Sequence, residues 1–330
     1  MTLGVAIIGC GLIGTKRARA LAGQKLVVCA DHDAARAERL AAATPGAQAT
    51  HDWHSALRHA DVDAVVVATT NDALAPVTLE AIRAGKHVLV EKPAARKAEE
   101  LGPLIEAARA ARVCVRVGFN HRHHPAVLKA LALAREGALG EMMFLRARYG
   151  HGGRIDYDRE WRADPEKSGG GELIDQGVHL IDLARCFLGE FEHVTGFAKT
   201  YYWDMPVDDN AFMLLRTRED RAAFLHVSCT EWKNLFSLEL YGKSGKLQID
   251  GLGGSYGIER LTYYRMLPEM GPPETVSWEY PMGDRSWASE FEEFVDDIAH
   301  RREPSAGLQD ALKALQVVEQ IYRGSGHDHR

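Results

Sequence analysis

The chain has 330 residues, enough for about two domains of ordinary size, and its 46% hydrophobic and 26% charged residues are typical of a globular protein. The formal net charge of -6 provides no basic surface for nucleic acid, and no apolar run reaches the length of about 20 residues that a membrane helix needs. The N-terminus has no signal-peptide pattern, so we expect a cytoplasmic protein without a membrane partner.

The cysteines are odd in number and scattered, and none belongs to a CxxC pair. We expect reduced, mostly buried thiols in preference to a disulfide or metal role. They are Cys10, Cys29, Cys114, Cys186 and Cys229.

In the first part of the chain, short Val-rich apolar runs alternate with stretches rich in Ala, Leu, Arg and Glu. This alternation predicts βαβ units and a parallel sheet, and the nearly continuous apolar strands favour a sheet covered on both faces. The predicted strands are 4–8, 26–30, 63–69, 87–91 and 113–119, and the predicted helices are 13–22, 33–43, 75–84 and 97–111.

The pattern changes after about residue 120 to runs in which apolar and polar residues alternate. Such runs predict an antiparallel sheet with one packed face and one open face. The runs are 142–149, 194–203, 210–217, 222–231, 235–241 and 246–250, and the predicted helices of this part are 125–136, 287–300 and 307–323. We therefore divide the chain into domains 1–120 and 121–330.

The segment Gly9-Cys10-Gly11-Leu12-Ile13-Gly14 has the spacing GxGxxG, follows a predicted strand and opens a predicted helix. In that context the glycines permit a tight turn, a close approach to a pyrophosphate and close helix packing. An ordinary glycine turn is the alternative reading. We expect a dinucleotide to contact Gly9, Gly11, Leu12, Ile13 and Gly14.

Two further strand ends extend this predicted cofactor site. Asp31 follows the second strand, where a carboxylate holds the adenine ribose and repels a 2′-phosphate, so NAD is favoured over NADP. His32 and Arg36 could approach such a phosphate and weaken that preference. Thr69, Thr70 and Asn71 follow the third strand and are expected to line the cofactor crevice, with a simple strand cap as the alternative.

Candidate chemistry lies at two places. Glu91-Lys92-Pro93 ends the fourth strand, and we expect Glu91 and Lys92 to contact the cofactor as well. Lys92 either donates hydrogen bonds to a substrate oxygen or is a solvated surface lysine. Asp175 and His179 are four residues apart after three glycines, so they share one face of a predicted helix. A histidine accepts protons near neutral pH, and a carboxylate can orient it; Asp182 is a rival partner. The alternative is a routine exposed pair.

Other polar segments predict substrate contacts. Asn120 through Pro125 forms either a substrate loop or a domain junction, and residues 150–162 are rich in Arg and His. Asp175, His179 and His151 could in principle bind a metal ion, but zinc spacings such as HExxH are absent, so we expect no metal site. The predicted substrate-binding residues are Asn120, Arg122, His151, Trp161, Arg162, Asp175 and His179.

The motifs GCGLIG, TTN, AGKHVLVEKP, GFNHRHHP and SGGGELIDQGVHLIDL occur in this order, with WASEFEEFVDDIAHRREPSAGLQDALKALQVVEQIYRGS near the C-terminus. Together they resemble the Gfo/Idh/MocA family of sugar and cyclitol oxidoreductases. The resemblance implies a Rossmann domain followed by an α+β domain with a large, mostly antiparallel open sheet that commonly forms dimers and tetramers. It also implies that Lys92, Asp175 and His179 are catalytic, with His179 as acid/base.

The chain departs from the family pattern at the TTN motif, where Thr70 replaces the usual Pro and no His follows Asn71. GFNHRHHP also has His where many members have Arg or aromatic residues. The insert before the three glycines resembles that of members acting on sugar nucleotides or cell-surface sugars. These departures leave the substrate open among sugars, sugar nucleotides and cyclitols.

The predicted function is an NAD(H)-dependent oxidoreductase that interconverts a secondary alcohol and a ketone on such a substrate. One alternative keeps the fold but recycles a bound NAD during glycoside cleavage or an internal redox reaction. The other alternative is a non-catalytic dinucleotide sensor.

Overall fold

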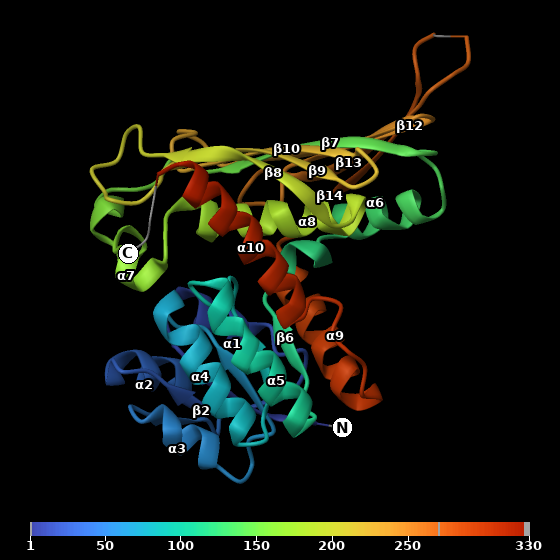
Figure 1. Cartoon of the computed structure of the whole chain (residues 1–330). Coiled ribbons are helices and arrows are strands. Elements are labelled where there is room, and N and C mark those ends of the chain that lie inside the picture. The colour runs from blue at the N-terminus through green and yellow to red at the C-terminus, as the bar shows by residue number, and fades with distance from the viewer. Residues whose placement is uncertain (1, 270, 327–330) are drawn as a thin grey trace. The chain divides into compact units, whose positions relative to one another are not determined.

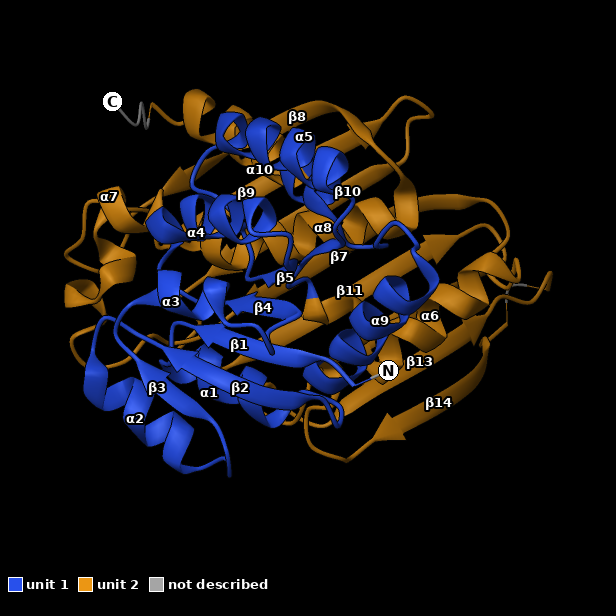
Figure 2. Cartoon of the chain, turned by 90° about the horizontal axis from the view of Figure 1, so that it is seen from below, with its two compact units in different colours: residues 1–119, 287–313 blue, residues 120–286, 314–330 orange. Residues whose placement is uncertain are grey.

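The computed structural model describes residues 2–269 and 271–326. The chain forms two compact units, coloured separately in Figure 2. The first contains the residues up to Phe119 together with Trp287–Lys313, and the second contains Asn120–Ser286 with the residues from Ala314 onward. The predicted boundary near residue 120 lies at one break between the units, but 287–313 group with the first unit.

The first unit has a six-stranded sheet in the order β3 (Gln48–Thr50), β2 (Lys25–Ala30), β1 (Gly4–Ile8), β4 (Ala64–Val67), β5 (His87–Val90) and β6 (Val115–Val117) (Figure 1). Every pair is parallel, which confirms the predicted Rossmann-type arrangement. The central strands β1 and β4 are buried along their whole length because both faces of the sheet are covered. The strand order reverses between β1 and β4, which is where open α/β sheets bind ligands.

The helices of this unit confirm the four predicted in the first 120 residues, with shifted ends. β3 and α3 have no predicted counterpart because both are short, and two of the three β3 residues are exposed. The elements are α1 (Leu12–Arg19), α2 (Ala34–Ala42), α3 (Trp53–Arg58), α4 (Asn71–Arg83), η1 (Ala98–Glu100), α5 (Leu101–Ala111), most of α9 (Ser286–His300) and the start of α10 (Leu308–Gly324).

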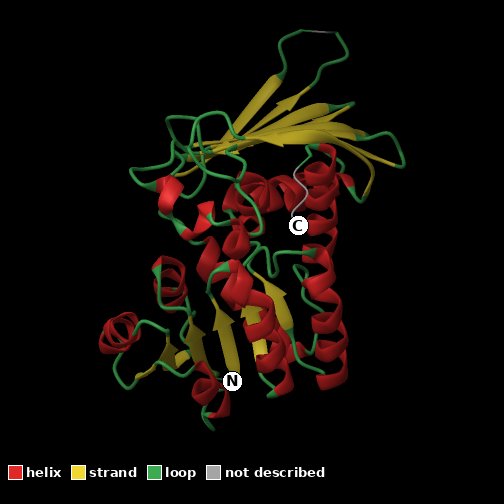
Figure 3. Cartoon of the chain, turned by 60° about the vertical axis from the view of Figure 1, so that its left-hand side comes forward, coloured by secondary structure: helices red, strands yellow, loops and turns green. Residues whose placement is uncertain are grey.

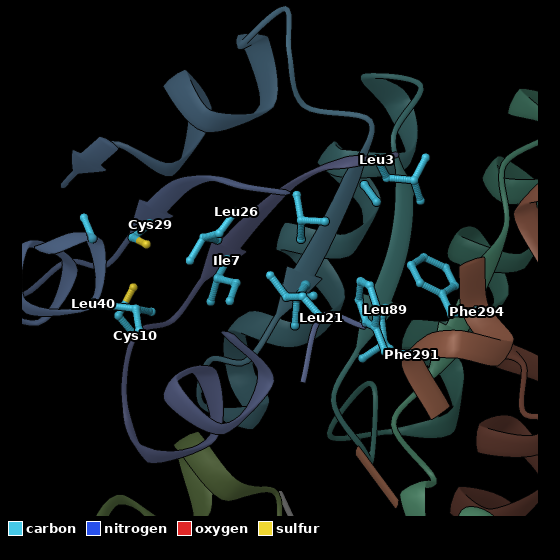
Figure 4. Close-up of a cluster of buried hydrophobic side chains, with 14 of the residues drawn as sticks. Leu3, Ile7, Cys10, Leu21, Leu26, Cys29, Leu40, Leu89, Phe291 and Phe294 are labelled. Atoms are coloured by element: carbon cyan, nitrogen blue, oxygen red, sulfur yellow. The ribbon is translucent and has the colours of Figure 1, made fainter. Parts of the chain in front are cut away.

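Helix α9 groups with the first unit because its apolar face is part of that unit's core. Phe291 and Phe294 are fully buried in a cluster that includes Leu89 of β5 (Figure 4). A buried ion pair also joins α9 to β6, where Arg116 lies 2.5 Å from Asp297. The helix itself is predictable from its repeat, but these long-range contacts are not.

The second unit has an eight-stranded sheet in the order β14 (Glu274–Tyr280), β13 (Glu259–Arg265), β12 (Gly245–Asp250), β11 (Leu235–Gly242), β7 (Met142–Gly150), β10 (Ala222–Ser228), β9 (Asn210–Thr217) and β8 (Phe191–Lys199). All pairs are antiparallel except β7 with β10, which confirms the large, mostly antiparallel sheet. β13 and β14 have no predicted counterpart. The side chains of β14 are mostly exposed at the sheet edge, so the strand lacks apolar alternation.

Helices α6 (Pro125–Arg135) and α8 (Val178–Leu188) contact this sheet on one face (Figures 1 and 3). Among the described residues, the other face has no helix over it and exposes Phe197, Leu214 and Phe224. Short turns complete the unit: η2 (Asn120–His123), η3 (Tyr157–Arg159), η4 (Trp161–Ala163), α7 (Pro165–Ser168) and the π-type turn η5 (Leu173–Gly177). Within the described ranges, none of the helices could cross a bilayer.

Candidate functional site

In the glycine turn after β1, close packing requires Gly9 and Gly14, whereas Gly11 lies next to open space. Gly9 has φ +95°, and a Cβ there would lie 2.4 Å from the carbonyl oxygen of Ala68. A Cβ on Gly14 would lie 1.8 Å from the carbonyl oxygen of Gly9. At Gly11, by contrast, no protein atom lies within 4 Å of the Cβ position. The fold therefore does not itself require glycine at 11, which fits a pyrophosphate approaching the backbone.

Asp31, just after β2, is tied to the same turn. Its carboxylate accepts the N–H of Cys10 at 2.7 Å and the N–H of Asp33 at 2.9 Å. The side chain is 4% exposed, and the exposed ring of His32 lies 3.1 Å from it. A carboxylate held here can accept hydrogen bonds from ribose hydroxyls, so the residues present fit a dinucleotide without a 2′-phosphate.

The other predicted cofactor residues follow neighbouring strands. Thr69 and Thr70 connect β4 to α4 and are half-buried, whereas Asn71 is buried in the first turn of α4. Lys92 follows β5 and is also half-buried. Glu91 is buried, and its carboxylate accepts a hydrogen bond from Arg17 Nε at 2.6 Å. Glu91 therefore has a charged partner inside the first unit. Leu12 and Ile13 open α1, and Leu12 is 73% exposed.

Backbone conformation or close packing favours glycine at the three positions before η5, where Gly169 has φ +76°. Gly170 has φ +151°, and a Cβ on Gly171 would lie 1.8 Å from the carbonyl oxygen of Asp208. The Asp208 carboxylate accepts the N–H groups of Gly171 and Leu173, at 2.9 and 2.8 Å, and the hydroxyl of Tyr322 at 2.7 Å. Burial raises the pKa of Asp208 above its ordinary value, although these hydrogen bonds act to lower it. Sequence reasoning missed Asp208 because it is remote in the chain and belongs to no motif.

Asp175 lies in η5 and is half-buried. Arg162 Nε donates to Asp175 Oδ2 at 3.0 Å, and the Arg162 guanidinium lies over the ring of Trp161, 4.6 Å from its centroid. Three predicted residues from two separate segments, Trp161 and Arg162 in one and Asp175 in the other, are thus brought together. His179 follows in the first turn of α8 and is 5% exposed.

The His179 ring is stacked on the ring of His121, with centroids 3.8 Å apart and an angle of 17° between the planes. His121 belongs to η2 and is 6% exposed. The ring of Tyr149 from β7 presents an edge to both, at 5.0 Å from His121 and 6.3 Å from His179. The sequence places both histidines in polar motifs but gives no indication of this contact.

Two predicted substrate residues have partners within the second unit. Arg122 Nε and Nη2 lie 2.7 and 2.5 Å from the carboxylate of Asp182, the rival partner of His179 in the sequence. Asn120 is buried, and its Nδ2 donates to Ser286 Oγ at 2.8 Å. Their proposed role in substrate binding stays a prediction.

His151 is half-buried and lies beside the buried Glu172. Its Nε2 lies 3.4 Å from Glu172 Oε1, and its Nδ1 accepts the N–H of Gly153 at 2.9 Å. Tyr157 donates to the same Glu172 oxygen at 2.8 Å. Burial lowers the pKa of His151, but Glu172 and Asp175 together raise it above its ordinary value. Glu172 is inside a motif yet escapes prediction because its burial depends on the fold.

In the described residues, no three His, Cys, Asp or Glu side chains form a group that could hold a metal ion. All five cysteines lie in the described part of the chain, where none forms a disulfide, and all but Cys186 are buried, as predicted.

Comparisons with known proteins agree with this architecture. Residues 3–119 match the oxidoreductase family with an NAD-binding Rossmann fold, and residues 127–248 match the GFO/IDH/MocA C-terminal domain. A levoglucosan dehydrogenase of Pseudarthrobacter phenanthrenivorans is 34% identical over 51% of this chain. That match spans only 44% of the relative's own length. An inositol 2-dehydrogenase of Rhizobium meliloti is 26% identical over 98% of this chain and 97% of the relative.

Among solved structures, a levoglucosan dehydrogenase in complex with NADH superposes with a TM-score of 0.88. It covers 99% of this chain and 98% of the other, at 23% identity. At this identity the likeness shows that the two chains share a fold.

Proposed function

Because the chain belongs to the Gfo/Idh/MocA family of NAD-binding oxidoreductases, we propose that it interconverts a secondary alcohol and a ketone on a sugar, sugar nucleotide or cyclitol. The observation that carries the proposal is the His179 imidazole, buried at the start of α8 one turn after Asp175. A histidine in such a place is a candidate proton acceptor, and the glycine turn of the first unit provides for the cofactor.

Bound NAD supplies the acceptor for the hydride that leaves the alcohol carbon. His179 takes the hydroxyl proton as the carbonyl forms, and returns it in the reverse direction. Lys92 donates a hydrogen bond to the same oxygen and stabilises its developing negative charge. Asp175 assists His179, and its own position is supported by Arg162 at 3.0 Å.

The proposed substrate is a polyhydroxylated ring. Support comes from the residue types of the second unit, because Asn, Arg, His and Trp side chains recognise ring hydroxyls and ring faces. The relatives named for levoglucosan and inositol also act on such rings by name. We assign substrate contacts to Asn120, Arg122, His151, Trp161 and Arg162, and cofactor contacts to the predicted strand-end residues.

We further propose a homodimer or homotetramer formed through the open face of the large sheet. Phe197, Leu214 and Phe224 are 46%, 53% and 47% exposed there, and such a patch favours burial against a second copy. Phe224→Glu should then give a smaller species in light scattering.

We place the enzyme in the cytosol, where its thiols would stay reduced.

The test is NAD reduction, followed at 340 nm, with myo-inositol, levoglucosan, aldoses, uronates and sugar nucleotides. We expect turnover with at least one of these and loss of turnover in His179→Ala. NAD binding without turnover on any of them would favour the sensor. Product formation without accumulating NADH would favour the recycling enzyme.

A further inference from the structure

The second unit contains a stacked pair of buried histidines, His121 and His179. His121 lies face to face with His179 at 3.8 Å and is itself almost fully buried. We propose that His121 is a positioning residue that fixes the plane of the His179 ring. This inference rests on the proposed function, in which His179 carries the proton.

A chain of hydrogen bonds holds His121. The Ser286 hydroxyl donates to Asp284 Oδ1 at 2.6 Å, and Asn120 Nδ2 donates to Ser286 Oγ at 2.8 Å. This fixes the Asn120 amide, whose Oδ1 then lies 3.3 Å from His121 Nδ1. Since an amide oxygen can only accept, His121 Nδ1 is the N–H donor of this contact. The ring therefore has one preferred tautomer and one preferred orientation.

Aromatic edges surround His121 on its other sides. The rings of Tyr149, His124 and Phe236 lie 5.0, 5.7 and 6.1 Å away, at angles of 63°, 84° and 65°. Packing on several sides together with the Asn120 hydrogen bond restricts tilting of the His121 plane. His121 is thus a fixed flat surface against which the His179 ring lies.

Such a surface matters because the χ2 torsion of a histidine has a broad, shallow minimum and does not fix the ring by itself. Rotation about χ2 swings the ring nitrogens through space. A reacting group displaced by about 1 Å can lose about 100-fold in rate. A flat neighbour in contact with the whole ring face restricts that rotation without touching the substrate.

The test compares two variants with the wild type on the polyol oxidised fastest in the screen above. His121→Leu removes the flat ring at similar volume and should lower kcat by about 10- to 100-fold, because the acid/base loses its alignment. The KM values for NAD and polyol should stay within about twofold of wild type, since Asn120, a proposed substrate contact, keeps its hydrogen bond to Ser286. His121→Phe keeps a flat ring and should restore most of kcat, and the melting temperature of each variant is measured alongside.

A second readout needs no substrate. In protein labelled with 13C at histidine Cε1, the His179 resonance, assigned with His179→Asn, should carry the ring-current shift of its stacked neighbour. His121→Phe should retain a comparable shift and His121→Leu should abolish it. Wild-type kcat in His121→Leu, or a His179 resonance that does not respond to this change, overturns the inference. Wild-type turnover in His179→Ala would instead overturn the proposed function, so the two failures are distinguishable.

Discussion

Arg17 Nη1 lies 2.6 Å from Glu290 Oε2, and both side chains are completely buried although they are 273 residues apart in the chain. Arg17 also contacts Glu91, so one cation lies between two carboxyl groups. Burial, opposed by Arg17 and reinforced by the charge of Glu91, raises the pKa of Glu290 to about 7. Below this pKa, a proton on Glu290 therefore reduces the negative charge beside Arg17.

The first prediction follows from that pKa. Since Glu290 has a higher pKa folded than unfolded, its contribution to stability is complete below its ordinary value of about 4.5 and is lost as pH rises to about 7. Compared with Glu290→Gln, the wild-type free energy of unfolding should fall by roughly 3 kcal/mol across that window, at about 1.4 kcal/mol per pH unit. Urea denaturation of both proteins between pH 4.5 and 8 measures this; parallel curves would contradict it.

The second prediction uses two glycines of one turn. Gly14→Ala places a Cβ 1.8 Å from the Gly9 carbonyl oxygen and should destabilise the first unit. Gly11→Ala meets no protein atom within 4 Å, so its melting temperature should stay near wild type while its NAD affinity falls by about tenfold or more, because the pyrophosphate is kept away. Thermal melting and NAD titration separate the two effects. If Gly11→Ala binds NAD as tightly as the wild type, the pyrophosphate does not contact Gly11.

The third prediction concerns cofactor choice at Asp31. We expect kcat/KM with NAD to exceed that with NADP by more than about tenfold, because the carboxylate repels a 2′-phosphate. Asp31→Asn should narrow this ratio, whereas Asp61→Asn, at an exposed position before β4, should leave it unchanged. Equal wild-type efficiency with both cofactors would rule out the preference.

The fourth prediction tests the proposed acid/base and the lysine. His179→Ala and Lys92→Ala should each lower kcat by about 100-fold or more, as expected for proton transfer and for stabilisation of a developing oxyanion. Exposed residues of the same type serve as controls, and His300→Ala and Lys97→Ala should behave as wild type. Initial rates at saturating NAD and polyol decide the matter.

The fifth prediction concerns Asp208, which supports the turn that leads to Asp175. Asp208→Asn replaces one accepting oxygen with an N–H donor that faces the backbone N–H groups of Gly171 and Leu173. The free energy of unfolding should therefore fall by about 1–3 kcal/mol. Tyr322→Phe removes one hydroxyl donor and should cost about 1 kcal/mol. If the Asn variant is as stable as wild type in urea, Asp208 does not hold the glycine turn.

The sequence alone determined the features that depend on residues close together in the chain. Valine-rich strands alternating with helices specify the parallel sheet, alternation in the second part specifies the antiparallel sheet, and GxGxxG after a strand specifies the glycine turn. Periodicity and turn chemistry depend on neighbours within a few residues, so they can be read without knowing the fold. The edge strand β14 escapes because its exposed side chains carry no such repeat.

Only the tertiary structure decided which remote side chains meet. Asp208 at the glycine turn, His121 against His179 and α9 in the first core all depend on contacts between segments far apart in the chain. Such contacts are selected by packing and by the need to pair buried polar groups, and neither leaves a local signature in the sequence. The sequence thus identified the candidate acid/base, and the fold identified the residues that contact it.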